Sequence, residues 1–192
     1  MKRFVCLLFV LILIPLFAFA SSSYTPSLKM YLSDLLSSYN SIGTPFNTPL
    51  VGLTNVYKSY LFDGYQCFEY LADKYSGTHV VFFSSDPFAK SQNPSCGIDR
   101  IQISINDTKH FLSFVTVADR LVSLFAPNLF GMETSSYFVT QLMKDFYQNN
   151  CLESGQSYYR QLEDGGDIYL WFYYSDNYYT LEICSGSFLT NK

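Results

Sequence analysis

The chain has 192 residues, of which 48% are hydrophobic and 15% are charged. Twelve basic and sixteen acidic residues give a formal net charge of −4. An acidic chain without a basic run cannot neutralise many phosphates, so nucleic acid is excluded as the main partner. The length suits one domain or two small packed subdomains.

The first twenty residues have the three zones of a secretory signal peptide. Lys2 and Arg3 come first, an apolar run over 4–17 follows, and small residues lead up to Ala20. This order predicts cleavage after Ala20 and a secreted chain. The apolar run is shorter than the roughly 20 residues that span a bilayer, so we expect it to be removed rather than kept as an anchor.

Cleavage would change both the charge and the number of cysteines. The mature chain, 21–192, loses two basic residues and Cys6, which leaves ten basic residues, sixteen acidic residues and a net charge of −6. Its most apolar stretch, 111–130, is interrupted by two charged residues and a proline. We therefore expect no transmembrane span in the mature chain.

The mature chain keeps four cysteines: Cys67, Cys96, Cys151 and Cys184. An even number in an oxidising compartment predicts two disulfides, for which three pairings are possible. We favour Cys67 with Cys96 and Cys151 with Cys184, because each closes a loop of about 30 residues and would stabilise the fold by roughly 3 kcal/mol. Zinc binding lacks a close-spaced Cys-x-x-Cys pair, and we expect neither a metal nor a cofactor.

Asn106-Asp107-Thr108 is an acceptor tripeptide for N-glycosylation. The second candidate, at Asn93, is blocked by a proline. In an exported chain, Asn106 is predicted to carry a glycan at the tip of a hairpin.

The first half of the mature chain, 21–117, is predicted to contain two helices followed by antiparallel strands. Apolar residues at three- and four-residue steps indicate a helix over 28–39. A second helical stretch is expected over 54–75, with a break at Asp63-Gly64. Three strands are expected at 79–83, 98–105 and 110–117, the last two joined by a turn at Asn106-Asp107.

The second half, 118–192, repeats this order. A short helix over 121–125 and a longer one over 134–149 are followed by strands at 156–162, 168–174 and 178–184. Together with short matches such as Ser76-Gly77 and Ser154-Gly155, the repeated order suggests an internal duplication. We therefore predict an α+β fold of two similar helix-plus-meander units, packed together and stapled by disulfides.

In element order this arrangement resembles tandem cystatin-like proteins of the latexin kind, in which each unit wraps a sheet around a helix. The resemblance implies architecture alone. The Gln-x-Val-x-Gly loop by which cystatins block cysteine proteases has no match in the sequence. Protease inhibition is therefore not implied.

Candidate catalytic residues are few, because the sequence has only two histidines and none of the common hydrolase or nucleotide-binding motifs. His79 and His110 both fall in predicted strands. With Lys109 they would provide an acid, a base and a phosphate contact for phosphodiester cleavage, which is the enzymatic alternative. An acidic cluster at Glu163, Asp164 and Asp167 suits a polar turn better than a calcium loop, because it lacks EF-hand spacing.

Aromatic residues are unusually abundant, with 17 tyrosines and 18 phenylalanines, and they concentrate over 169–179. In a strand, Tyr169, Trp171 and Tyr173 share one face, and Leu170, Phe172 and Tyr174 share the other. We expect Trp171 to pair across strands with Tyr179 or Leu181.

The leading functional hypothesis is a secreted binding protein rather than an enzyme. Tyrosine and tryptophan are enriched at interaction hot spots. We therefore predict that Tyr169, Trp171, Tyr173 and Tyr179 contact an extracellular or cell-surface protein or glycan. A small lipid or pheromone carrier, with a cavity between the two units, is a further alternative.

Overall fold

The computed structural model describes residues 24–41, 53, 55–72, 77–87, 89, 95–125, 141, 144–145, 148, 157–162 and 166–189. The expected signal peptide, Cys151 and most of the helix expected over 134–149 lie outside these ranges.

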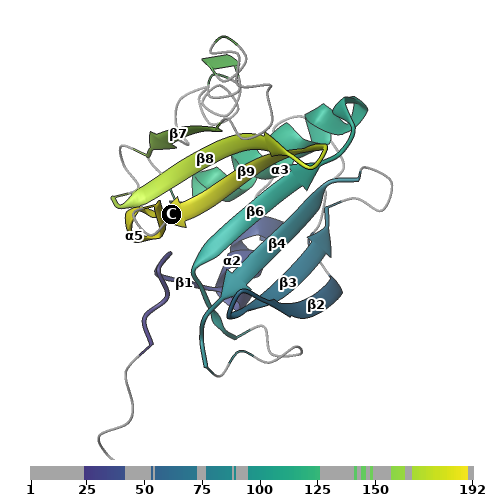
Figure 1. The fold of residues 1–192 in the computed structure, drawn as a ribbon. Helices are drawn as coiled ribbons and strands as arrows, with labels where there is room; N and C mark the ends of the chain where they lie inside the picture. Colours follow the sequence, from purple (N-terminus) through teal and green to yellow (C-terminus); the bar gives the residue numbers. More distant parts are fainter. Residues whose placement is uncertain are drawn as a thin grey trace, which may run out of the picture.

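In the described part of the chain, seven strands form one antiparallel sheet (Figure 1). Its order is β2-β3-β4-β6-β9-β8-β7, so β6 and β9 join the two halves of the chain at the centre. The strands are β2 (Val56–Phe62), β3 (Tyr65–Leu71), β4 (His79–Ser84), β6 (Arg100–Ile105), β7 (Ser157–Gln161), β8 (Ile168–Ser175) and β9 (Tyr178–Ser185). The fold is therefore mixed α+β with mostly antiparallel strands, as predicted, and a duplication is not shown.

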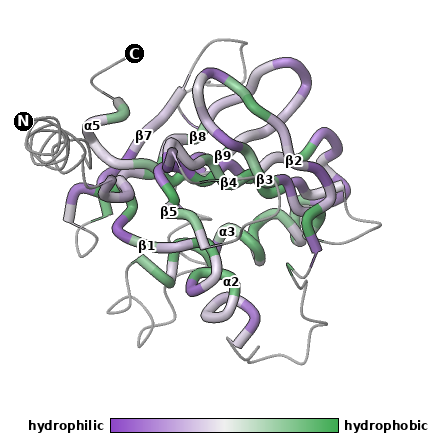
Figure 2. The backbone as a smooth tube through the Cα atoms, turned by 90° about the horizontal axis from the view of Figure 1, so that it is seen from below, coloured by the Kyte–Doolittle hydropathy of each residue, from purple (hydrophilic) through white to green (hydrophobic). Residues whose placement is uncertain are grey.

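The two longer described helices, α2 (Leu32–Ser41) and α3 (Phe111–Phe125), cover one face of this sheet (Figure 2). Leu35 of α2 and Phe114 of α3 are fully buried in one core that also contains Ile101, Ile103 and Phe172 of the strands. A short helix, α5 (Gly186–Leu189), follows β9. The main core thus lies between the helices and one face of the sheet.

The helix expected over 54–75 is wrong, because this segment forms the β2–β3 hairpin. Asp63 and Gly64 make its two-residue turn, with φ angles of 49° and 79°. Such turns require positive φ at both residues, and Asp-Gly is a preferred pair for them. The flanking tyrosines, valine and phenylalanines favour strands as well.

The strand expected over 110–117 is also wrong. Asp107 caps the short 3-10 helix η1 (Thr108–His110) by accepting a hydrogen bond from the Lys109 amide, and α3 follows directly. The buried residues of α3 recur at three- and four-residue steps from Phe114 to Phe125, so the helical period extends through the whole segment. Asn106 is exposed, but it lies between β6 and η1 rather than at a hairpin tip.

The first helix begins at Leu32 rather than at residue 28. Lys29 has a φ of 53°, and the next two residues form β1 (Met30–Tyr31), which pairs with β5 (Gly97–Ile98). The remaining predicted strands are confirmed within one or two residues at each end.

The expected disulfide between Cys67 and Cys96 is wrong. The three cysteines that the structure describes, Cys67, Cys96 and Cys184, are buried, and none of them is in a disulfide. Cys67 packs with Val81 and Phe83, whereas Cys96 belongs to the main core beside the helices. The sheet separates the first two thiols, and hydrophobic packing stabilises this region without a covalent link.

Candidate functional site

The face of the sheet opposite α2 and α3, hereafter the open face, carries the predicted aromatic row. In β8 the side chains alternate, so Leu170 and Phe172 are fully buried in the main core. Tyr169, Trp171 and Tyr173 lie on the open face and are half-buried. The predicted alternation of β8 therefore agrees with the structure.

The predicted partner of Trp171 is wrong. Trp171 lies opposite Glu182, while Tyr179 lies opposite Tyr174 on the helix-covered face. The rings of Tyr174 and Tyr179 are 4.8 Å apart. Tyr179 therefore does not share a surface with the other three predicted contact residues.

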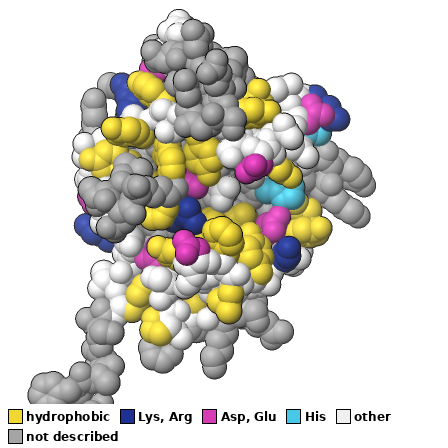
Figure 3. Space-filling model, in the orientation of Figure 1, with side chains coloured by type: hydrophobic (Ala, Val, Ile, Leu, Met, Phe, Trp, Pro, Cys, Tyr) yellow, Lys and Arg dark blue, Asp and Glu magenta, His cyan; other side chains and the backbone are white. Residues whose placement is uncertain are grey.

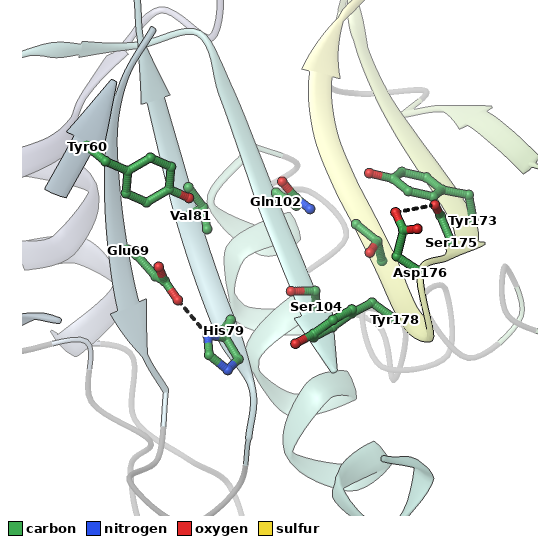
Figure 4. Close-up of a pocket in the computed structure, with 11 residues that line it drawn as sticks. Tyr60, Glu69, His79, Val81, Gln102, Ser104, Tyr173, Ser175, Asp176 and Tyr178 are labelled. Carbon is green, nitrogen blue, oxygen red and sulfur yellow. Dashed lines mark hydrogen bonds and ion pairs between the residues drawn. The ribbon is translucent and has the colours of Figure 1, made fainter. Parts of the chain in front are cut away.

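A groove of about 340 Å³ runs across the open face (Figures 3 and 4). Strands β2, β3, β4, β6, β8 and β9 all contribute side chains to it. The lining residues are Tyr60, Glu69, His79, Val81, Gln102, Ser104, Tyr173, Ser175, Asp176, Tyr178 and Thr180. Most of these side chains are polar or aromatic, so the groove suits a polar ligand better than a lipid.

The floor of the groove contains hydrogen-bonding groups that the protein does not use. Gln102 and Ser104 project from the central strand β6 into the groove (Figure 4). Neither side chain has a hydrogen-bond partner among the described residues, although Ser104 is only 8% exposed. The hydroxyl and the amide both face the groove, where they are available to hydrogen-bond to a ligand.

Tyrosines form the sides of the groove. Tyr60 comes from β2, and Tyr173 and Tyr178 come from the β8–β9 hairpin. The Tyr173 hydroxyl donates a hydrogen bond of 2.8 Å to Glu182. Burial, followed by the negative charge of Glu182, raises the pKa of Tyr173 well above its ordinary value, so its hydroxyl remains a donor.

An acidic residue orients the one histidine of the groove. The Glu69 carboxylate lies 2.6 Å from Nδ1 of His79, and the two side chains come from neighbouring strands (Figure 4). This contact directs Nδ1 toward Glu69 and leaves Nε2 on the other side of the ring. Such a pair can orient the imidazole for hydrogen bonding to a ligand.

The predicted phosphodiester site is not assembled in this groove. His110 and Lys109 lie on η1 rather than on a strand, and neither lines the groove that contains His79. Lys109 instead forms an exposed ion pair of 2.6 Å with Asp107.

At the other end of the open face, α5 lies over a buried ion pair. The Arg100 guanidinium is 3.3 Å from Glu182, and it stacks between the rings of Phe83 and Phe188 at 3.7 and 4.7 Å. A second cavity of about 440 Å³ lies beside it. Glu182 also accepts the hydrogen bond from Tyr173, so Arg100 is connected through Glu182 to a tyrosine that lines the groove.

Two kinds of signal for the groove were present in the sequence. Gln102 and Ser104 alternate with three isoleucines, which marks them as the outward positions of a half-buried strand. Tyr60 and Glu69 were missed because their segment was interpreted as a helix. The Asp63-Gly64 pair was the signal that would have placed them on a hairpin.

No protein-family model matches the chain, and no curated protein or solved structure is significantly similar to it. The resemblance to tandem cystatin-like proteins thus gains no support from these comparisons. Among the described residues, no group of acidic, histidine and cysteine side chains is arranged to hold a metal ion. Within the same ranges, no helix is both long and apolar enough to cross a membrane.

Proposed function

We propose that the protein is a secreted binding module that holds a glycan in the groove of its open face. The observation that carries this proposal is the floor of the groove, where Gln102 and Ser104 have no partner among the described residues. Glycans present many hydroxyl groups, each able to donate and accept a hydrogen bond. They can therefore satisfy an amide and a hydroxyl together.

The aromatic walls and the charges of the groove agree with this ligand class. Tyr60 and Tyr178 offer flat rings with an apolar body and a polar tip, which suits a ligand that is apolar on its ring faces and polar at its edges. Among the described lining residues there is no lysine or arginine. A phosphodiester would meet Glu69 and Asp176 without a fixed positive charge, so a nuclease is the weaker proposal.

A printed glycan array, probed with the purified protein and three single variants, tests the proposal. We expect the wild type to bind a defined subset of glycans. Gln102→Leu and Ser104→Ala should each weaken that binding by about tenfold, because each removes one hydrogen bond to the ligand.

Gln161→Leu is the matched control, since Gln161 is an exposed glutamine on the open side of β7 and does not line the groove. It should bind like the wild type. The proposal fails if no glycan is captured, or if both floor variants retain full binding.

Secretion and glycosylation remain proposals supported by the sequence and, for Asn106, by exposure of the side chain. We expect the protein in the culture medium of eukaryotic cells to begin at Ser21 and to lose mass on treatment with an N-glycosidase. Asn106→Gln should abolish that mass change. A protein that stays inside the cell with Met1 intact would contradict export.

A further inference from the structure

We infer, building on the proposed glycan site, that the groove selects a glycan bearing protonated amino groups, such as an oligosaccharide of glucosamine. Three observations support this ligand class: the carboxylates on opposite walls, the tyrosine rings that line the groove, and the Ser104 hydroxyl on the floor, which has no partner among the described residues.

The two carboxylates belong to different elements and lie on opposite sides of the groove (Figure 4). Glu69 comes from β3, and Asp176 comes from the β8–β9 turn. One oxygen of Glu69 contacts His79, and one oxygen of Asp176 accepts a 3.0 Å hydrogen bond from Ser175. The second oxygen of each carboxylate has no partner among the described residues, so each can accept a hydrogen bond from an ammonium group.

The tyrosine rings strengthen the preference for a cation. The ammonium of Lys58 lies 5.0 Å from the centre of the Tyr60 ring, which shows that this ring can contact a cation. Lys58 also lies opposite Glu69 in the β2–β3 pair, so it competes with a bound amine for that carboxylate, although its exposure lets solvent screen the repulsion. The acidic net charge of the mature chain, −6, also favours the approach of a cationic ligand.

Ser104 provides evidence of a ligand site that does not depend on the acidic residues. Its hydroxyl faces the groove between the two carboxylate walls, and the residue is 8% exposed (Figure 4). A hydroxyl can accept a hydrogen bond from an ammonium or donate one to a sugar oxygen. An amino sugar offers both types of group, so it matches the floor and the walls of the groove together.

Three matched trisaccharides test the inference by titration calorimetry at mildly acidic pH, where the amino groups are protonated. The β-1,4-linked trimers of glucosamine, N-acetylglucosamine and glucose share one backbone and differ only at carbon 2 of each sugar, which carries an ammonium, an amide or a hydroxyl. We expect the glucosamine trimer to bind at least about tenfold more tightly than the other two, because a charged hydrogen bond contributes more than a neutral one.

Charge-neutralising variants identify the groups responsible. Glu69→Gln should weaken binding of the glucosamine trimer by about tenfold, and the more exposed Asp176→Asn by about threefold. Lys58→Met should leave the affinity unchanged or raise it. Asp63→Asn is the matched control, because Asp63 occupies the corresponding positive-φ turn position of the β2–β3 hairpin but does not line the groove.

The possible results separate this inference from the proposed function. Equal affinity for the three trimers, preference for a neutral one, or no binding of the glucosamine trimer overturns the inference. The proposed function is tested separately by the floor variants on the glycan array. If array binding depends on Gln102 but does not differ between glycans with and without amino groups, the proposed glycan site is supported and the preference for amino sugars is contradicted.

Discussion

Arg100 shows how a charged side chain is stabilised inside this protein. Arg100 is 8% exposed and Glu182 is 1% exposed, so their ion pair is largely removed from water. Aromatic rings stack on the guanidinium, and the Tyr173 hydroxyl supplies a further hydrogen bond to the carboxylate. Each charge therefore depends on the other for compensation.

Replacing one member of this ion pair should lower the free energy of unfolding more than replacing both members. Arg100→Met is expected to lower the free energy of unfolding by about 3 kcal/mol, because it leaves the Glu182 carboxylate buried and uncompensated. The double variant Arg100→Met with Glu182→Met should recover most of that loss. Urea denaturation measures both values, and a double variant as unstable as the single one would contradict the explanation.

The buried thiols provide a second test at the scale of single residues. Burial raises the pKa of Cys67 to about 11 and also raises the pKa of Cys96. The reactive thiolate is therefore scarce at neutral pH. We expect Cys67, Cys96 and Cys184 to resist a thiol reagent in the native protein and to react once it is unfolded in urea without a reductant. Peptide mapping that finds Cys67 bonded to Cys96 would contradict the described packing.

At the scale of elements, two short turns connect strands that contribute to the groove. Asp63-Gly64 joins β2 to β3, and Asp176-Asn177 joins β8 to β9; all four residues have positive φ. This geometry matches the twist of the flanking strands, so it fixes which residues face one another. The second hairpin was predicted from its sequence, whereas the first was interpreted as a break in a helix.

A substitution at Gly64 tests the importance of the first turn. Its φ is 79° and no atom lies within 4 Å of an added Cβ, so the cost of Gly64→Ala arises from the backbone alone. We expect a loss of about 1 kcal/mol in the free energy of unfolding. Gly64→Asn should lose less, since asparagine tolerates this conformation better, and equal losses for the two variants would argue against the described turn.

Local patterns predicted some elements better than others for a physical reason. The strands after residue 156 are bounded by turn residues and rich in tyrosine. The two-residue alternation of side chains and the strand preference of these residues therefore indicate the same structure. In α3, phenylalanine, valine and threonine favour a strand locally, but the buried stripe from Phe114 to Phe125 repeats with the helical period. Burial of this stripe against the sheet overrides the local preference.

At the scale of the whole molecule, the central pairing of β6 with β9 determines the candidate site. These strands are far apart in the sequence, yet Ser104 lies opposite Thr180 and Gln102 lies opposite Glu182. Alternation within a strand reveals which residues share a face, but not which strand lies alongside. The polar residues of β6 could thus be predicted to face outward, while their meeting with Glu69 and Tyr178 in one groove could not.

The buried tyrosines make the stability of the whole fold sensitive to alkaline pH. Burial raises the pKa of Tyr70 from 10.0 to about 12, and burial with the charge of Glu182 raises that of Tyr173 further. Below pH 10 both folded and unfolded chains keep these protons. Above pH 10 the unfolded chain loses its tyrosine protons at a lower pH than the folded chain does. The free energy of unfolding therefore falls as the pH rises.

Urea denaturation from about pH 9 to about pH 11 measures this effect. We expect the midpoint to decrease steadily over this range, and we expect Tyr70→Phe to reduce the slope. Unchanged stability across the range, or full ionisation of Tyr70 and Tyr173 in the folded protein near pH 11, would contradict the burial of these hydroxyls.

The central claim is that a glycan occupies the groove of the open face, and nuclear magnetic resonance tests it most directly. The probe is a glycan that the wild-type protein captures on the array, added to protein labelled with nitrogen-15. We predict shifts of the Gln102 side-chain amide and of backbone amides near His79, Ser104 and Tyr178. Shifts confined to α2, α3 or the exposed edge of β2, with the Gln102 amide unmoved, would contradict the account.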